Sequence, residues 1–170
     1  MQDFWVFGYG SLMWRPGFDV LDSMPATMHG MHRSLCIYSW VHRGTQKRPG
    51  LVLGLDAGGS CRGMAFKVAG SNRNDVIDYL RARELVTNVY LEVERPVKLD
   101  NGERVQVMTY VVDPTHEQYA GRLPHEKLVA QIHGAVGQSG KNEEYILNTV
   151  THLRELCIHD AGLEKLVAGF

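Results

Sequence analysis

The stretch Phe7-Gly-Tyr-Gly-Ser-Leu12 stands near the start of the chain, directly after a short apolar run. The run from Phe4 to Phe7 is aromatic and β-branched, which predicts a buried strand that ends in a glycine turn. Two glycines around a tyrosine leave the backbone amides unshielded, so the turn can form a concave nest of N–H donors for an anion or a carboxylate. A tight turn that serves only chain reversal has the same spacing, and the spacing leaves both interpretations open.

Several better-known motifs are incomplete in this sequence. A dinucleotide-binding fingerprint needs a third glycine where Met13 stands, and Trp14-Arg-Pro-Gly17 interrupts the helix that should follow. Ser11 lies outside a Gly-x-Ser-x-Gly elbow, which leaves a serine hydrolase poorly supported. The stretch Gly140-Lys-Asn142 lacks the first glycine and the hydroxyl of a phosphate-binding loop.

Length and composition describe one folded domain, which we expect to span residues 1–170. Apolar residues make up 44% of the chain and the net charge is −1, so the chain lacks the basic surface of a dedicated nucleic-acid binder. No apolar run approaches the ~20 residues that span a bilayer, and the first residues do not resemble a secretion signal. Three widely spaced cysteines argue against a disulfide framework. We therefore expect a cytoplasmic protein without membrane insertion.

The residue pattern predicts strands in the first two thirds of the chain and helices in the middle and at the end. We expect further strands at 51–55, 63–68, 89–94 and 104–112, helices at 72–86, 125–136 and 142–157, and a short element near 163–167. Asp56-Ala-Gly-Gly-Ser60 is predicted to connect two strands, and Asp100-Asn-Gly102 to form a hairpin turn. This order favours a mixed α+β domain.

Glu84 stands out on the helix predicted for residues 72–86. On a wheel of ~100° per residue that starts at Val76, Leu80 falls near ~40° and Glu84 near ~80°, in the middle of the apolar stripe. Arg81 and Arg83 fall to the sides, closer to solvent. Glutamate is rarely buried without a partner or a purpose. The alternative is that Glu84 lies at a fraying helix end and pairs with Arg81 or Arg83, and both interpretations stay open.

A glutamate in an apolar setting has a specific chemical use. Loss of water disfavours its charged form and raises its pKa, by up to ~3–5 for full burial. An ordinary glutamate has a pKa near ~4.3 and an α-amino group near ~8, so burial can close most of the gap between them. Such a base could take a proton from a substrate ammonium and later return it to a leaving amine.

The remaining polar motifs carry weaker signals. The eight histidines are scattered, and we expect no metal site. Cys36 and Cys157 are interpreted as small core residues. The segment from Arg43 to Arg48 is predicted to be an exposed, basic and mobile loop, which is either plain solvated surface or a flap that closes on an anionic substrate.

Trp5-Val-Phe-Gly-Tyr-Gly-Ser-Leu-Met-Trp14 resembles the opening of the ChaC-like γ-glutamylcyclotransferases, of the glutathione-specific branch. Segments that agree with this family in order follow along essentially the whole chain: Arg43-Gly-Thr45 with Pro49-Gly50, Arg83-Glu84, Tyr90-Leu91, Gly137 to Tyr145, and Asp160-Ala-Gly-Leu163.

The resemblance implies a γ-glutamylcyclotransferase-like fold, a small mixed sheet that closes toward a barrel with helices around it. The implied reaction cleaves a γ-glutamyl amide, most often that of glutathione, into 5-oxoproline and an amine such as cysteinylglycine, and it requires no metal or organic cofactor. Carried over by position, the catalytic glutamate is Glu84. The implied substrate-binding residues are Val6, Phe7, Gly8, Tyr9, Gly10, Ser11, Leu12, Tyr90 and Tyr145.

Three expectations accompany this resemblance. Arg43 is expected to recognise the far carboxylate of glutathione. Many relatives have a glycine shortly before the tyrosine that matches Tyr90, and Asn88 can take the same left-handed conformation. Whether the turn from Gly8 to Leu12 binds the substrate α-carboxylate or the developing oxyanion stays open.

Two alternative functions remain. The first is a cyclotransferase for other γ-glutamyl amines or γ-glutamyl amino acids. The second is a non-catalytic regulator of a cation transporter, in which the glycine turn is a binding nest and the basic loop docks an acidic partner.

Overall fold

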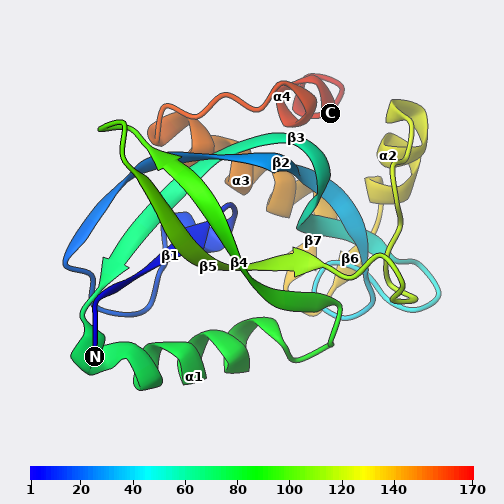
Figure 1. Ribbon diagram of the computed structural model, residues 1–170. Helices are drawn as coiled ribbons and strands as arrows, with labels where there is room; N and C mark the ends of the chain where they lie inside the picture. The colour runs from blue at the N-terminus through cyan, green and yellow to red at the C-terminus, as the bar shows by residue number, and fades with distance from the viewer. The chain divides into compact units, whose positions relative to one another are not determined.

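The computed structural model describes residues 1–170, coloured along the chain in Figure 1. Its contacts divide the chain into two units, residues 1–33 with 54–116 and residues 34–53 with 117–170. Strands β2 (Asp22–Ser39) and β3 (Gly50–Val68) contribute residues to both units. The single domain expected over residues 1–170 stays a prediction.

The first unit is built on a closed barrel whose strands follow the order β1-β3-β2-β4-β5. Its other strands are β1 (Phe4–Gly8), β4 (Tyr90–Leu99) and β5 (Arg104–Val112). β1 pairs with β3 in the antiparallel sense and with β5 in the parallel sense. β4 and β5 form the predicted antiparallel hairpin.

Helix α1 (Arg73–Glu84) lies along one side of this barrel (Figure 1). Val76 and Leu80 stand one turn apart on the helix and are both buried, as the apolar stripe predicts. The cluster that joins helix and barrel contains Phe4, Val6, Leu12, Val68, Val76, Leu80, Met108 and Tyr110. Because β1 and Leu12 share this cluster with α1, packing fixes the glycine turn and the helix within one unit.

The second unit holds the helices of the C-terminal third and a short hairpin. Its elements are α2 (His125–Ile132), β6 (Val136–Gly137), β7 (Gly140–Lys141), α3 (Asn142–Glu155) and α4 (Ala161–Ala168). The buried Asn142 side chain donates to the Leu51 carbonyl and accepts from the Leu51 N–H, each at 2.8 Å. This two-way bond joins the start of α3 to β3 inside the unit.

Several elements differ from the sequence prediction. β2 was not among the predicted strands, and β4 extends to Leu99 where a strand over 89–94 was expected. β3 is one continuous strand where two strands joined through Asp56 to Ser60 were expected. Gly58 and Gly59 have φ values of 101° and 65°, so the glycines bend the strand without ending it. α2 ends at Ile132, not at Val136, because His133 already has an extended backbone and Gly134 follows with a φ of 75°.

Candidate active site

The glycine turn connects β1 to a 3-10 helix, Ser11–Met13. The Met13 N–H donates to the Gly10 carbonyl at 2.9 Å, and the Arg15 N–H donates to the Ser11 carbonyl at 2.8 Å. Apart from Gly10 itself and its two neighbours in the chain, no atom lies within 4 Å of the place that a Cβ on Gly10 would take. The backbone at Gly10 therefore faces open space, which leaves room for a small molecule.

Two side chains from the barrel hold the carbonyls beside this turn. The Thr109 hydroxyl donates to the Phe7 carbonyl at 3.0 Å, and Arg33 Nε donates to the Tyr9 carbonyl at 2.6 Å. Both carbonyls are thus held in place, so the amides between them point in a fixed direction. Neither Thr109 nor Arg33 was predicted from the sequence to be part of the site.

The residues predicted to bind substrate from Val6 to Leu12 divide into two groups. The side chains of Val6, Phe7 and Leu12 are buried in the core, and Gly8 is buried as well, so these four residues can reach a ligand only through their backbone. Tyr9 and Gly10 are half-buried and Ser11 is exposed. Their binding roles stay predictions.

Glu84 is the last residue of α1, and its side chain is 22% exposed. It lies on the buried side of the helix, as the wheel predicts, but at the shallow end of the stripe. Burial raises the pKa of the Glu84 carboxyl above its ordinary value, and the Arg83 guanidinium opposes part of that rise. The alternative pairing is also present in part, because Arg83 Nε lies 3.7 Å from Glu84 Oε1.

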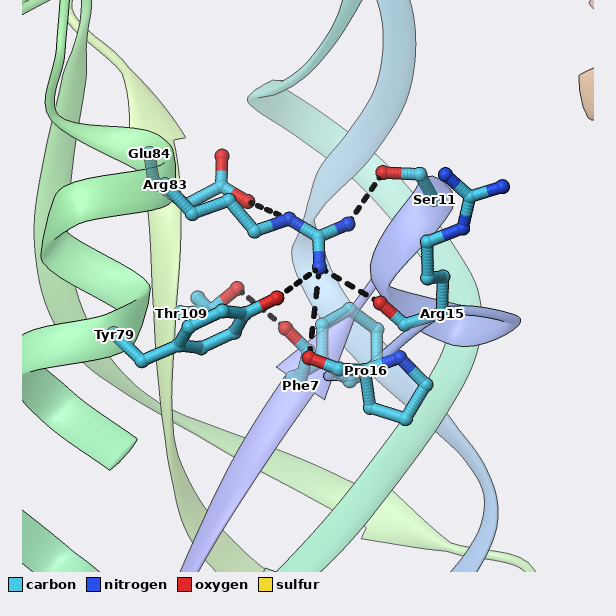
Figure 2. A network of polar contacts seen from close by, with 8 residues as sticks. All are labelled: Phe7, Ser11, Arg15, Pro16, Tyr79, Arg83, Glu84 and Thr109. Atoms are coloured by element: carbon cyan, nitrogen blue, oxygen red, sulfur yellow. Dashed lines mark hydrogen bonds and ion pairs between the residues drawn. The ribbon is translucent and has the colours of Figure 1, made fainter. Parts of the chain in front are cut away.

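Arg83 differs from the prediction that it lies toward solvent. Its side chain is 20% exposed and reaches the segment that follows the glycine turn (Figure 2). One terminal nitrogen donates to the Ser11 hydroxyl at 2.8 Å, and the other donates to the Arg15 carbonyl at 2.7 Å. A helical wheel gives a direction from the helix axis and cannot give the reach of a long side chain.

Arg81 makes a separate contact on the same helical turn. It donates two hydrogen bonds to Glu92 on β4, at 3.0 and 2.9 Å. Glu92 Oε1 also accepts from the Tyr110 hydroxyl at 2.8 Å. The last turn of α1 is therefore tied to the barrel by Arg81 and to the glycine-turn segment by Arg83.

Tyr90 opens β4 and packs against the cluster that joins α1 to the barrel. Asn88, two residues earlier, has a φ of 59° and takes the left-handed conformation that the sequence analysis allowed for it. α1 has already ended at Glu84, so this conformation belongs to the connection between helix and strand.

Arg43 and Tyr145 lie together in the second unit. The Arg43 guanidinium stands 5.6 Å from the centre of the Tyr145 ring and donates to the Lys141 carbonyl at 3.2 Å. The Tyr145 hydroxyl accepts from the Leu53 N–H at 3.0 Å. These two predicted binding residues are thus brought together, and their roles stay predictions.

The loop from Arg43 to Arg48 is held by hydrogen bonds at both ends. The Arg43 N–H donates to the Ser39 hydroxyl at 2.9 Å, and Arg48 donates to the Ala130 carbonyl at 3.1 Å and to the His133 carbonyl. Gly44 packs directly against the backbone at Gly50, with no room for a Cβ. The structure therefore describes an anchored loop where the sequence suggested a mobile one.

Two further observations concern metal and membrane. The structure brings together no group of three His, Cys, Asp or Glu side chains that could hold a metal ion. None of its helices is long and apolar enough to cross a membrane.

Comparison with known proteins decides the family. The family model described as ChaC-like protein matches residues 4–169. The chain belongs to this family. The ChaC-like chain is 32% identical over 165 residues to a protein of Escherichia coli K12 named glutathione-specific gamma-glutamylcyclotransferase, covering 97% of this chain and 71% of the relative. A human protein named glutathione-specific gamma-glutamylcyclotransferase 1 is 35% identical, with 98% and 77% covered.

A solved structure supports the fold of this ChaC-like protein. It is a selenomethionine-labelled γ-glutamylcyclotransferase specific to glutathione from yeast, and it matches with a TM-score of 0.86. The match covers 99% of this chain and 95% of the other at 22% identity. The predicted α+β fold of the γ-glutamylcyclotransferase type is therefore confirmed.

Proposed function

We propose that this protein is a γ-glutamylcyclotransferase that converts glutathione into 5-oxoproline and cysteinylglycine. The observation that carries the proposal is Glu84, a carboxyl whose burial favours its protonated form, at a helix end tied to the glycine-turn segment. The names of the bacterial and human relatives support glutathione as the substrate.

The first chemical step is a proton transfer. The α-amine of a γ-glutamyl compound is an ammonium ion at neutral pH and cannot attack until it loses a proton. Glu84 accepts that proton as a general base, and its raised pKa makes the transfer less unfavourable than it would be to an ordinary glutamate.

The second step closes a ring. The neutral amine nitrogen attacks the γ-carbonyl carbon of the same molecule and forms a five-membered ring, and the negative charge collects on the carbonyl oxygen. The amide C–N bond then breaks as Glu84 gives its proton to the leaving amine. The ring nitrogen loses its second proton to the Glu84 carboxylate, which passes it on to the free amine and so returns to its starting form. No water is consumed. Since nucleophile and electrophile share one substrate, the protein acts mainly by holding a bent conformer.

The glycine turn supplies the contacts to the substrate backbone in this proposal. Gly10 faces open space, and the carbonyls of Phe7 and Tyr9 are held by Thr109 and Arg33. A turn fixed in this way presents preorganised N–H donors to an anion. That anion is either the substrate α-carboxylate or the oxyanion of the ring-closing step.

Arg43, Tyr90 and Tyr145 complete the proposed set of binding residues. Arg43 is assigned to the glycine carboxylate of glutathione because its guanidinium is held over an aromatic ring and keeps further donors for a fork-shaped contact. Tyr145 is assigned to the glutamyl end, and Tyr90 to the substrate near the start of β4.

The experiment that tests the proposal uses purified protein and reduced glutathione. Equal amounts of 5-oxoproline and cysteinylglycine should accumulate, and a Glu84→Gln protein made in parallel should release neither. Products of a water-dependent cleavage, glutamate and cysteinylglycine, would contradict the ring-closing reaction. Turnover of other γ-glutamyl amides in place of glutathione would move the protein to the first alternative, and no product from any of them would favour the transporter-regulator alternative.

The Arg43 assignment is tested separately. Arg43→Ala should raise KM for glutathione about tenfold, as expected when one charge-assisted contact is lost, and should change kcat much less. Arg48→Ala is the matched control, because Arg48 belongs to the same loop but donates its hydrogen bonds to the carbonyls of Ala130 and His133. Its KM for glutathione should therefore change less than that of Arg43→Ala. Equal KM values for wild type and Arg43→Ala would remove Arg43 from the site.

We also propose a cytoplasmic location. Cys36 and Cys61 are buried, whereas Cys157 is exposed, so the prediction of a core position was wrong for Cys157. This use of cysteine suits a reducing compartment, where glutathione is itself kept reduced.

A further inference from the structure

The network around Arg83 connects two parts of the first unit that are far apart in the sequence, helix α1 and the segment from Ser11 to Pro16 (Figure 2). Its guanidinium donates to the Ser11 hydroxyl at 2.8 Å, to the Arg15 carbonyl at 2.7 Å and to the Pro16 carbonyl at 3.5 Å. Ser11 lies at the end of the glycine turn, and the other two acceptors lie in the segment that leaves it. One side chain on α1 thus holds the backbone on which that turn depends.

Tyr79 supports the same contact from one helical turn away. Its hydroxyl accepts from Arg83 at 3.1 Å, and residues four apart share a helix face. The phenol also fills the space beside Gly17, whose φ is 79° and which has no room for a Cβ. Tyr79 and Arg83, on one face of α1, therefore contact the segment from Ser11 to Gly17 along its length.

Arg83 is also the cation nearest to the proposed base. Its Nε lies 3.7 Å from Glu84 Oε1, and both side chains are mostly buried. In such a setting a cation favours the ionised carboxylate more strongly than it would in water. The base must be ionised to accept a proton, so this charge bears on the reaction directly.

The other titratable group that faces Glu84 comes from the barrel. Tyr110 on β5 feels the charge of Glu84, but burial and its hydrogen bond to Glu92 raise the pKa of the phenol, so it stays neutral during any ordinary assay. Glu92 in turn is matched by Arg81 at 2.9 Å. Arg83 is the charged group that stands in contact with Glu84.

We infer that Arg83 is a positioning residue of the proposed reaction: it fixes the segment behind the glycine turn to the helix end that carries Glu84, and it places a positive charge 3.7 Å from that carboxyl. This inference rests on the proposed function. The Arg83 side chain then has two effects that can be separated. Its hydrogen bonds hold the segment behind the glycine turn, and its positive charge stabilises the ionised form of Glu84.

Two substitutions separate the duties. Arg83→Lys keeps the charge and loses the fork. It should raise KM for glutathione about tenfold. The acidic limb of the profile, the pH range in which kcat/KM falls as the pH is lowered, should lie at the same pH as in the wild type. Arg83→Met loses both, so it should show the same rise in KM, and its acidic limb should also move to higher pH because Glu84 now holds its proton more tightly.

The matched control is Arg81→Met on the same helical turn. Arg81 forms a closer, two-pronged ion pair, but with Glu92 and not with Glu84, so its loss should leave both KM and the acidic limb close to those of the wild type. The inference is overturned if the limb of Arg83→Met stays in place, if KM is unchanged in both Arg83 variants, or if Arg81→Met produces the same shifts.

A readout that does not depend on turnover separates this inference from the proposed function. The Glu84 side-chain carboxyl can be titrated by carbon NMR in wild type and in Arg83→Met or, if the methionine protein does not fold, in Arg83→Gln. A higher midpoint in the variant supports the electrostatic duty even if the wild type does not act on glutathione. An unchanged midpoint overturns it even if the wild type is fully active.

Discussion

Glu84 and Glu92 are two glutamates of the same unit with opposite surroundings. Glu92, 25% exposed, accepts two hydrogen bonds from Arg81 and one from Tyr110. These bonds, those of Arg81 above all, hold the pKa of the Glu92 carboxyl below its ordinary value. Glu84 is similarly shielded, but its cation lies 3.7 Å away, beyond hydrogen-bond distance, and burial raises its pKa.

The opposite pKa directions of Glu84 and Glu92 follow from how many donors each carboxyl has gained in exchange for water. A carboxylate whose oxygens are fully used by donors has little affinity for a further proton, so Glu92 is fitted to hold structure together. A carboxyl that has lost water without gaining donors is ready to take a proton from a ligand. The two arginines account for this difference. Arg81 donates its paired hydrogen bonds to the Glu92 carboxylate, whereas Arg83 donates its own to the glycine-turn segment.

The largest difference between the two sites is expected in kcat, when each glutamate is replaced by glutamine. Glu84→Gln should lower kcat about 10³-fold or more, because the volume is kept and only the base is lost. Glu92→Gln should stay within about threefold of the wild type, as usual for a substitution away from the reacting atoms. Steady-state assays of both proteins with glutathione check this, and comparable losses in the two would mean that the activity depends on the network as a whole.

The same pair should have opposite effects on stability. At pH 8 Glu84→Gln should be more stable than the wild type, because glutamine removes an ionised carboxyl from a site poor in water. The native state binds this proton more tightly than the unfolded chain, so wild-type stability falls as the pH rises from the ordinary glutamate value near ~4.3 through the raised native pKa. The advantage of Glu84→Gln should therefore vanish near pH 4.

Glu92→Gln should follow the reverse course. Its native pKa is lowered, so the wild-type carboxylate contributes stability above the ordinary glutamate value and loses it as the pH falls through the native pKa. At pH 8 the variant should melt about 2 °C below the wild type, a modest loss because the ion pair is partly exposed. Thermal unfolding of the two variants at pH 4, 6 and 8 measures both courses, and differences of the same sign at pH 8 would contradict the assignment.

The smallest effect on stability is expected from a substitution of Arg81, whose ion pair with Glu92 lies away from the proposed base. Arg81→Lys keeps the charge beside Glu92 and loses the two-pronged contact, so the melting temperature should fall by no more than about 1 °C. KM for glutathione should not change. A rise in KM as large as that expected for Arg83→Lys would show that the two arginines do not divide their tasks.

The sequence was enough to predict the elements that carry regular patterns. β5 has the predicted bounds, and α1 ends two residues before the expected position, since alternation and the apolar stripe are read directly from residue types. β3 was mispredicted as two strands because glycines mark turns and bends alike, and only the pairing with other strands decides between them. The helix at residues 125–136 was drawn too long, although Gly134 offered a stop signal.

The sequence predicts a site residue where the residue type is unusual for its structural element. Glu84 is a charged residue on the apolar stripe of a helix, and Tyr9 is flanked by two glycines directly after a strand. Arg83 presents none, because an arginine beside a glutamate fits an exposed helix end, and its reach to a segment some 70 residues earlier depends on the fold. The agreement of the pair Arg83-Glu84 with the family was the signal in the sequence that could have identified it.

The most direct test of this account is a carbon NMR titration of the side-chain carboxyls of Glu84 and Glu92 in the same sample, each assigned by its loss in the corresponding glutamine variant. The account predicts a midpoint for Glu84 above that of an ordinary glutamate and a midpoint for Glu92 below it. A Glu84 midpoint at or below the ordinary value would mean that this carboxyl is well solvated or paired, and would leave the proposed proton transfer without its base.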